Sequence, residues 1–97
     1  MNDKIQSSFP SAIWHLYVVE CSDGSLYTGI TTNVDRRVSQ HSAGKGAKYT
    51  RSRKPVKLIT SWEIGNRSEA SKAEYAFKQN TRKEKLRLLA EEKWSDI

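Results

Sequence analysis

The pattern of apolar and polar positions predicts three strands in the first two thirds of the chain. Residues 13–20 and 25–30 are rich in aromatic and β-branched residues, and Asp23-Gly24 lies between them. Two such segments around a turn signal are typical of a β-hairpin. Apolar residues return at 56–64, between Pro55 and Gly65. This return predicts a third strand.

Helices are predicted on either side of the third strand. Three residues can cap the first helix: Thr31, Thr32 and Asn33. This helix should run to about His41 and end at Gly44. Ser68 can cap a second helix that reaches about Gln79.

A capping-box pattern, Thr81 with Glu84, begins a last helix. The predicted order is β-β-α-β-α-α, without long crossovers between strands. The fold class is therefore α+β, with a small three-stranded, mainly antiparallel sheet flanked by helices. Residues 1–12 are expected to form a flexible polar tail, and residues 13–94 a single domain.

The charge balance indicates a protein that meets polyanions. The 97 residues include 17 Lys and Arg against 11 Asp and Glu, a formal charge of +6. Such an excess favours nucleic acid as the partner. Residues 44–55 contain five cations and no acid: Lys45, Lys48, Arg51, Arg53 and Lys54.

The cysteine content and hydropathy exclude several classes of protein. Cys21 is the single cysteine, so an internal disulfide and a zinc site built on thiolates are excluded. No segment approaches the length of a membrane span. A cytoplasmic protein with no membrane partner is expected.

Charged residues fall on the packing face of the first helix. Val34 and Val38 lie one turn apart and define this face, which Arg37 and His41 share. The positions turned toward solvent are Arg36 and Gln40. In a structural interpretation, Arg37 lies at the edge of the face and extends its guanidinium to water.

Glu74 lies within the apolar stripe of the second helix, which contains Ala70, Ala73 and Phe77. Two structural interpretations are open for it: a capping box with Ser71, or an i,i+4 pair with Lys78. Buried Glu and Arg residues are rare unless they are paired. An Arg, a His and a Glu on the inner faces of two helices that share a sheet together indicate a site.

These residues resemble the GIY-YIG nuclease superfamily, in particular its small stand-alone bacterial branch of the YhbQ-like, UPF0213 type. Leu16-Tyr17-Val18 and Tyr27-Thr28-Gly29 correspond to the two family triplets, followed by Arg37, His41 and Glu74. The resemblance covers roughly residues 14–84. The departures from the family pattern are His15 and Leu16 in the first triplet and Ile30 after the second.

The resemblance implies a metal-dependent endonuclease that hydrolyses DNA phosphodiester bonds with low sequence specificity. Selectivity for DNA structure and a role in DNA repair or processing would fit this branch. The alternative is a non-catalytic nucleic-acid-binding or protein-interaction module that retains the fold. RNA is a further alternative as substrate. A monomer is expected, with an unknown protein partner for targeting as the alternative to low specificity.

The resemblance also implies a role for each matched residue. Glu74 would bind one divalent cation, Mg²⁺ or Mn²⁺, and Arg37 would hold the scissile phosphate. Tyr17 would be the general base, with His41 as a rival because its ordinary pKa is near 6.5. Tyr27 would help to position the water or the base.

The basic residues of segment 44–55 would bind the nucleic-acid backbone. Tyr49, within the same segment, could stack on an exposed base or pack on the sheet. Arg37, Glu74 and both tyrosines are expected to line one cleft, and Arg36 to point away from it.

The register of the hairpin decides whether Tyr17 and Tyr27 can belong to the same site. A two-residue turn at Asp23-Gly24 would pair Glu20 with Tyr27 and leave Tyr17 and Tyr27 on opposite faces. A three-residue loop or a bulge would bring both phenols to the same face. We therefore predict such an irregularity between the two tyrosines.

Overall fold

The structure, a computed structural model, describes residues 12–91 and confirms the predicted α+β fold. Its elements are β1 (Trp14–Glu20), β2 (Leu26–Thr31), α2 (Val34–Ser42), α3 (Lys48–Arg51), β3 (Lys57–Gly65), α4 (Arg67–Lys78) and α5 (Arg82–Glu91). The expected tail, apart from Ala12, and the expected domain end at residue 94 lie outside the described residues.

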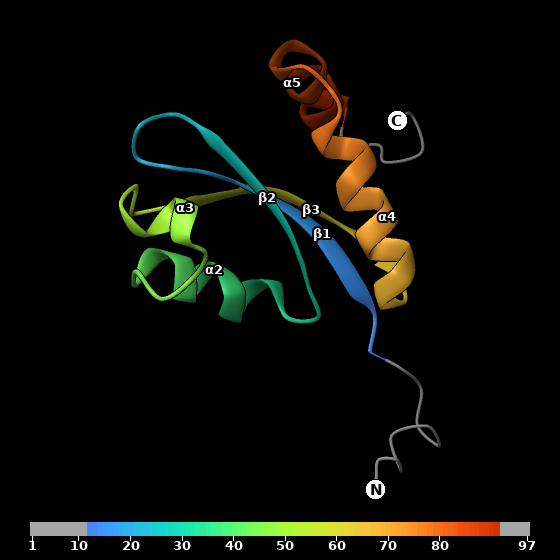
Figure 1. The fold of residues 1–97 in the computed structure, drawn as a ribbon, viewed down its shortest axis with the longest axis horizontal. Coiled ribbons are helices and arrows are strands. Elements are labelled where there is room, and N and C mark those ends of the chain that lie inside the picture. The colour runs from blue at the N-terminus through green and yellow to red at the C-terminus, as the bar shows by residue number, and fades with distance from the viewer. Residues whose placement is uncertain (1–11, 92–97) are drawn as a thin grey trace, which may run out of the picture.

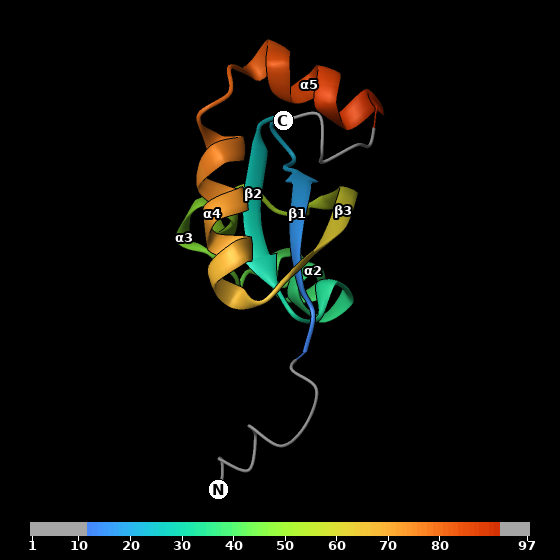
Figure 2. The same cartoon turned by 90° about the vertical axis from the view of Figure 1, so that its right-hand side faces the viewer.

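The fold has three layers around an antiparallel sheet of order β2-β1-β3. Helices α4 and α5 cover one face, and α2 with α3 covers the other (Figures 1 and 2). Alternate residues of β1 face the two layers. Leu16 and Val18 pack with Phe77 and Leu88, whereas Tyr17 and Val19 pack toward α2. Strand β2 is an edge strand, so residues of both helical layers can meet beside it.

The hairpin has a three-residue loop, which confirms the predicted irregularity. Cys21 N–H donates to the Ser25 carbonyl at 2.8 Å, and Gly24 N–H donates to the Cys21 carbonyl at 2.9 Å. Gly24 adopts φ +85°, a left-handed conformation that suits glycine. The loop pairs Val19 with Tyr27 and Tyr17 with Gly29. Both tyrosines therefore lie on the same face of the ribbon.

The first helix begins and ends as predicted. Asn33 is its N-cap and accepts from Arg36 N–H at 3.0 Å. Gly44, at φ +79°, lies just beyond the helix end. The basic segment 44–55, for which no helix was predicted, contains the short helix α3.

The predicted cap of the next helix is wrong by two residues. Asn66, not Ser68, caps α4 by accepting from Glu69 N–H at 2.8 Å. The Glu69 carboxylate accepts from Asn66 N–H at 2.9 Å, so this capping box satisfies two helix-end donors and outcompetes a lone serine. The box of Thr81 and Glu84 forms at the start of α5 as predicted.

The Gly24→Ala substitution should reduce the free energy of unfolding by about 1–2 kcal/mol, because alanine is strained in the left-handed region. Ser22→Ala, in the same loop, is the control and should change it by less than about 0.5 kcal/mol. Urea denaturation followed by circular dichroism measures both. Equal stabilities of the two variants would contradict the loop geometry.

Candidate active site

The side chain of Tyr17 extends from β1 across Gly29 of β2. A Cβ atom at Gly29 would lie 2.5 Å from the Tyr17 hydroxyl and 2.8 Å from its Cζ. These separations are far below van der Waals contact, so only glycine lets the phenol cross β2 at this point. The glycine of the second triplet thus has a steric role.

Tyr17 and His41 form a buried hydrogen-bonded unit. The Tyr17 hydroxyl lies 2.7 Å from His41 Nε2, and the Thr50 hydroxyl lies 2.7 Å from His41 Nδ1. His41 and Thr50 have no exposed surface, and Tyr17 is 1% exposed. Gly46 packs so closely against the imidazole that a Cβ there would collide with Nδ1. The ring is therefore fixed by hydrogen bonds at both nitrogens and by backbone at its side.

Arg37 is half-buried at the edge of α2. Its Nη1 donates to Gln40 Oε1 at 3.0 Å. The prediction that Gln40 turns toward solvent is therefore wrong, since this bond holds the amide half-buried beside the guanidinium. The charge of Arg37 acts on both Tyr17 and His41.

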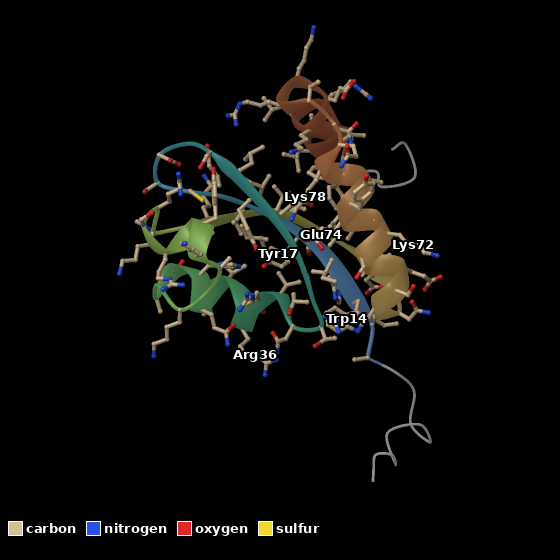
Figure 3. All side chains as sticks on the ribbon, viewed as in Figure 1. Trp14, Tyr17, Arg36, Lys72, Glu74 and Lys78 are labelled. Carbon is tan, nitrogen blue, oxygen red and sulfur yellow. The ribbon has the colours of Figure 1, made fainter. Side chains whose placement is uncertain are left out.

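Glu74 approaches the same region from α4. Figure 3 shows Glu74 and Lys78 on the side of α4 that faces Tyr17, and Lys72 on the outer side. Glu74 Oε2 lies 3.0 Å from Lys78 Nζ. The i,i+4 pair is thus the structural interpretation that holds, and the box with Ser71 is wrong because α4 begins earlier, at Asn66.

Burial and neighbouring charges shift the pKa values of Tyr17 and His41. Burial raises the pKa of the Tyr17 phenol to about 12, against the opposing effect of the Arg37 guanidinium, and the Glu74 charge adds to the rise. Burial, with the charge of Arg37, lowers the pKa of His41 below its ordinary value. Both groups are uncharged at neutral pH. Tyr17 can therefore accept a proton only after its own proton has left.

Two further aromatic rings, those of Tyr27 and Tyr49, lie between His41 and the start of β2. The Tyr27 ring meets the edge of His41, with centroids 5.2 Å apart, and stacks on Tyr49 at 5.9 Å. Lys78 Nζ lies 5.8 Å from the centre of the Tyr27 ring. Beside these rings is a cavity of about 390 Å³ that Tyr27, Tyr49, Lys78 and Lys85 help to line. Side chains of α3, α4 and α5 thus meet over β2.

Within residues 12–91, no three His, Cys, Asp or Glu side chains cluster to hold a metal ion. Among residues 12–91, Glu74 is the carboxylate whose charge acts on Tyr17, and its side chain is 25% exposed. A single carboxylate fits Mg²⁺, which keeps several waters and takes substrate phosphate oxygens as ligands. A cation at Glu74 would replace Lys78 as the partner of this carboxylate.

The predicted backbone-binding residues form an exposed surface on α3 and its flanking loops, with one difference in role. The exposed members are Lys45, Lys48, Tyr49, Arg51 and Lys54. Arg53 differs from them because its guanidinium already contacts Asp23 and Tyr49. Its Nε lies 3.0 Å from Asp23 Oδ2, and its guanidinium lies 4.0 Å from the centre of the Tyr49 ring. Arg53 therefore fixes Tyr49 against the hairpin loop.

Two cavities within residues 12–91 do not bear out the expectation that Arg37, Glu74 and both tyrosines line one cleft, because Tyr27 lines one cavity and Arg37 the other. Arg36 points away from Tyr17 and Glu74 (Figure 3). It nevertheless lines a second cavity together with Arg37, at the other end of β2. Sequence reasoning missed this cavity, and it missed Thr50 and Gln40 as partners of the site. No periodicity connects Thr50 to His41, because the two belong to different helices.

A scan against family models matches residues 13–87 to the GIY-YIG catalytic domain. The chain therefore belongs to the GIY-YIG family. Among its relatives, UPF0213 protein SAG0778 from Streptococcus agalactiae is 54% identical over 79 residues, covering 81% of this chain and 90% of the relative. The names of the UPF0213 relatives state no activity.

Two solution NMR structures resemble this one. UPF0213 protein BH0048 from Bacillus halodurans is 46% identical, with a TM-score of 0.53 over 80% of this chain and 83% of that one. Protein EF2693 from E. faecalis is 44% identical, with a TM-score of 0.54 over 81% and 85%. These neighbours support the fold. Among the helices of residues 12–91, none has the length and hydropathy to span a bilayer.

Tyr17 should ionise late in an alkaline titration, because its burial raises the pKa of the phenol to about 12. Below pH 10 the phenol is neutral in both states. Between about pH 10 and 12 the unfolded chain loses this proton while the folded chain keeps it, so stability falls as the pH rises. Absorbance titration of the phenolates, with Tyr17→Phe as control, measures this. A late step that persists in Tyr17→Phe would contradict the assignment.

Proposed function

We propose that this protein is a metal-dependent endonuclease that hydrolyses DNA phosphodiester bonds with low sequence specificity. The observation that carries the proposal is the convergence of Tyr17, Arg37 and Glu74 from three elements beside one edge strand. Membership of the GIY-YIG family supports the reaction class. We further propose that it acts as a cytoplasmic monomer in DNA repair or processing.

Arg37 would hold the scissile phosphate. Gln40 fixes one end of its guanidinium, and the remaining N–H groups can donate to two phosphate oxygens as a planar fork. The extra negative charge that develops in the transition state would be stabilised at the same place. The guanidinium also favours the ionised form of Tyr17.

Tyr17 and His41 would act together as the general base. His41 is neutral and lies within hydrogen-bond distance of the phenol, so it can take the Tyr17 proton at Nε2. The phenolate, next to Arg37, would then take a proton from the attacking water. In this arrangement the two residues are successive members of one relay, with Thr50 and Gly46 orienting the imidazole.

Glu74 would hold one divalent cation, which neutralises charge on the phosphate and assists the leaving oxygen when it is bound. The Glu74 carboxylate is held toward the site by Lys78, so it is oriented before a cation arrives. Lys78, once displaced, remains close enough to meet a neighbouring phosphate.

DNA would lie along β2 and the exposed surface of α3. Tyr49 is 39% exposed and stacked on Tyr27, which suits contact with an unpaired base. Lysines, arginines and aromatic rings recognise phosphates and the faces of any base, so low sequence specificity follows from the types of residue present.

Glu74→Gln and Arg37→Gln should each lower the rate of Mg²⁺-dependent plasmid nicking by at least about a hundredfold, because each removes charge stabilisation from the transition state. The matched controls are Glu63→Gln and Lys72→Gln, which change exposed residues away from the site. Both controls should nick at the wild-type rate.

Two results would count against the enzyme. If Glu74→Gln nicks as fast as wild type, the activity belongs to a contaminant. If wild-type protein binds DNA but never nicks plasmid, branched or single-stranded DNA in Mg²⁺ or Mn²⁺, the chain is a binding module. RNA substrates in the same assay test the alternative substrate.

A further inference from the structure

A second cavity, of about 360 Å³, lies at the end of β2 beyond Gly29. Three arginines from two helical layers line it: Arg36 and Arg37 of α2 and Arg67 of α4. Trp14 of β1 forms another wall, and no carboxylate is among the lining residues. Figure 3 shows Trp14 at the start of β1 and Arg36 below it, both on the far side of Glu74 from Lys78.

The described part of the chain supplies no acidic partner to the three guanidiniums. Within residues 12–91, no carboxylate forms an ion pair with Arg36, Arg37 or Arg67. Arg37 Nη1 donates to the neutral Gln40, and the guanidinium also acts on the Tyr17 phenol, which is likewise neutral at pH 7. Like charges gathered around one cavity raise the free energy of the folded chain unless an anion enters. The cavity therefore favours an anionic ligand.

Trp14 adds a second type of contact. The Arg67 guanidinium lies 5.4 Å from the centre of the Trp14 ring, a cation–π contact that positions the charge without using its N–H donors. Those donors can meet phosphate oxygens. The half-buried indole offers apolar surface on which a planar base can stack.

We propose that this cavity binds one nucleotide of the DNA strand, next to the scissile phosphate. Arg36 and Arg67 hold its phosphate, and its base stacks on Trp14. Arg37 lines this cavity and also acts on Tyr17, so the nucleotide is adjacent to the reacting one. The base must be unpaired to reach the indole, which makes the cavity a selector for unpaired nucleotides. The inference deepens the proposed nuclease function and rests on it.

The test measures binding without catalysis. Fluorescence anisotropy, in chelator, follows binding of two labelled probes by the full chain. One probe is a short oligothymidylate, and the other is the same length of abasic deoxyribose phosphate. Arg36→Gln and Arg67→Gln should weaken both probes about tenfold, and each should reduce the salt dependence by about one charge.

Trp14→Leu should weaken the oligothymidylate about tenfold more than the abasic probe, because only the base loses its stacking surface while both probes experience any shift of Arg67. Trp14→Tyr keeps an aromatic surface and should retain most of the affinity. Lys72→Gln, which removes a cation from the outer side of α4, is the matched control and should bind both probes as wild type does.

Equal weakening of both probes by Trp14→Leu would overturn the stacking role. Wild-type affinity of Arg36→Gln and Arg67→Gln would overturn the phosphate role. Because the assay contains no metal, it separates failure of this inference from failure of the nuclease proposal, which only the nicking assay decides.

Discussion

The hydrogen bond between Tyr17 and His41 is the interaction on which the candidate site depends. It joins the central strand to α2 through groups that have almost no contact with water. A buried phenol or imidazole without its partner costs about 1–3 kcal/mol, so the pair must form for the two layers to pack. Gly29 lets the phenol reach the imidazole, and Gly46 lets the following loop close over it.

This constraint also explains the position of the site beside an edge strand. The Tyr17 phenol crosses β2 at Gly29, which has no side chain. There, Arg37 from one layer and Glu74 from the other both influence its ionisation. The buried pair is neutral, whereas the groups around it are charged. A cavity lies toward each end of β2. A polyanionic strand lying along this edge would meet cations on both sides of the reacting groups.

Much of this arrangement could be predicted from sequence because it follows from local periodicity. Period-two alternation placed Tyr17 on one face of β1, and the need for Tyr27 on the same face required a three-residue loop or a bulge. The structure contains the loop. Helical periodicity placed Arg37 and His41 together. It could not supply the partner of His41, because Thr50 belongs to a short helix whose position depends on tertiary packing.

Other features could not be predicted from sequence because neighbouring groups compete for the same role or meet only in the folded chain. Asn66 and Ser68 are both good caps, and only the reciprocal bond from Glu69 decides between them. Helical periodicity places Gln40 toward solvent, and it cannot predict the hydrogen bond that the Gln40 amide accepts from Arg37. The cavity at Trp14 joins residues separated by as much as 53 positions, and no pattern within one element could reveal it.

The most direct test of the central claim is the plasmid-nicking rate of Gly29→Ala, measured with circular dichroism to show that the sheet remains folded. The added methyl group would collide with the Tyr17 hydroxyl and displace it from His41. We expect the rate to fall by at least about a hundredfold, as for loss of a general base. A folded Gly29→Ala protein that nicks DNA at the wild-type rate would contradict the claim that the phenol over Gly29 is part of the active site.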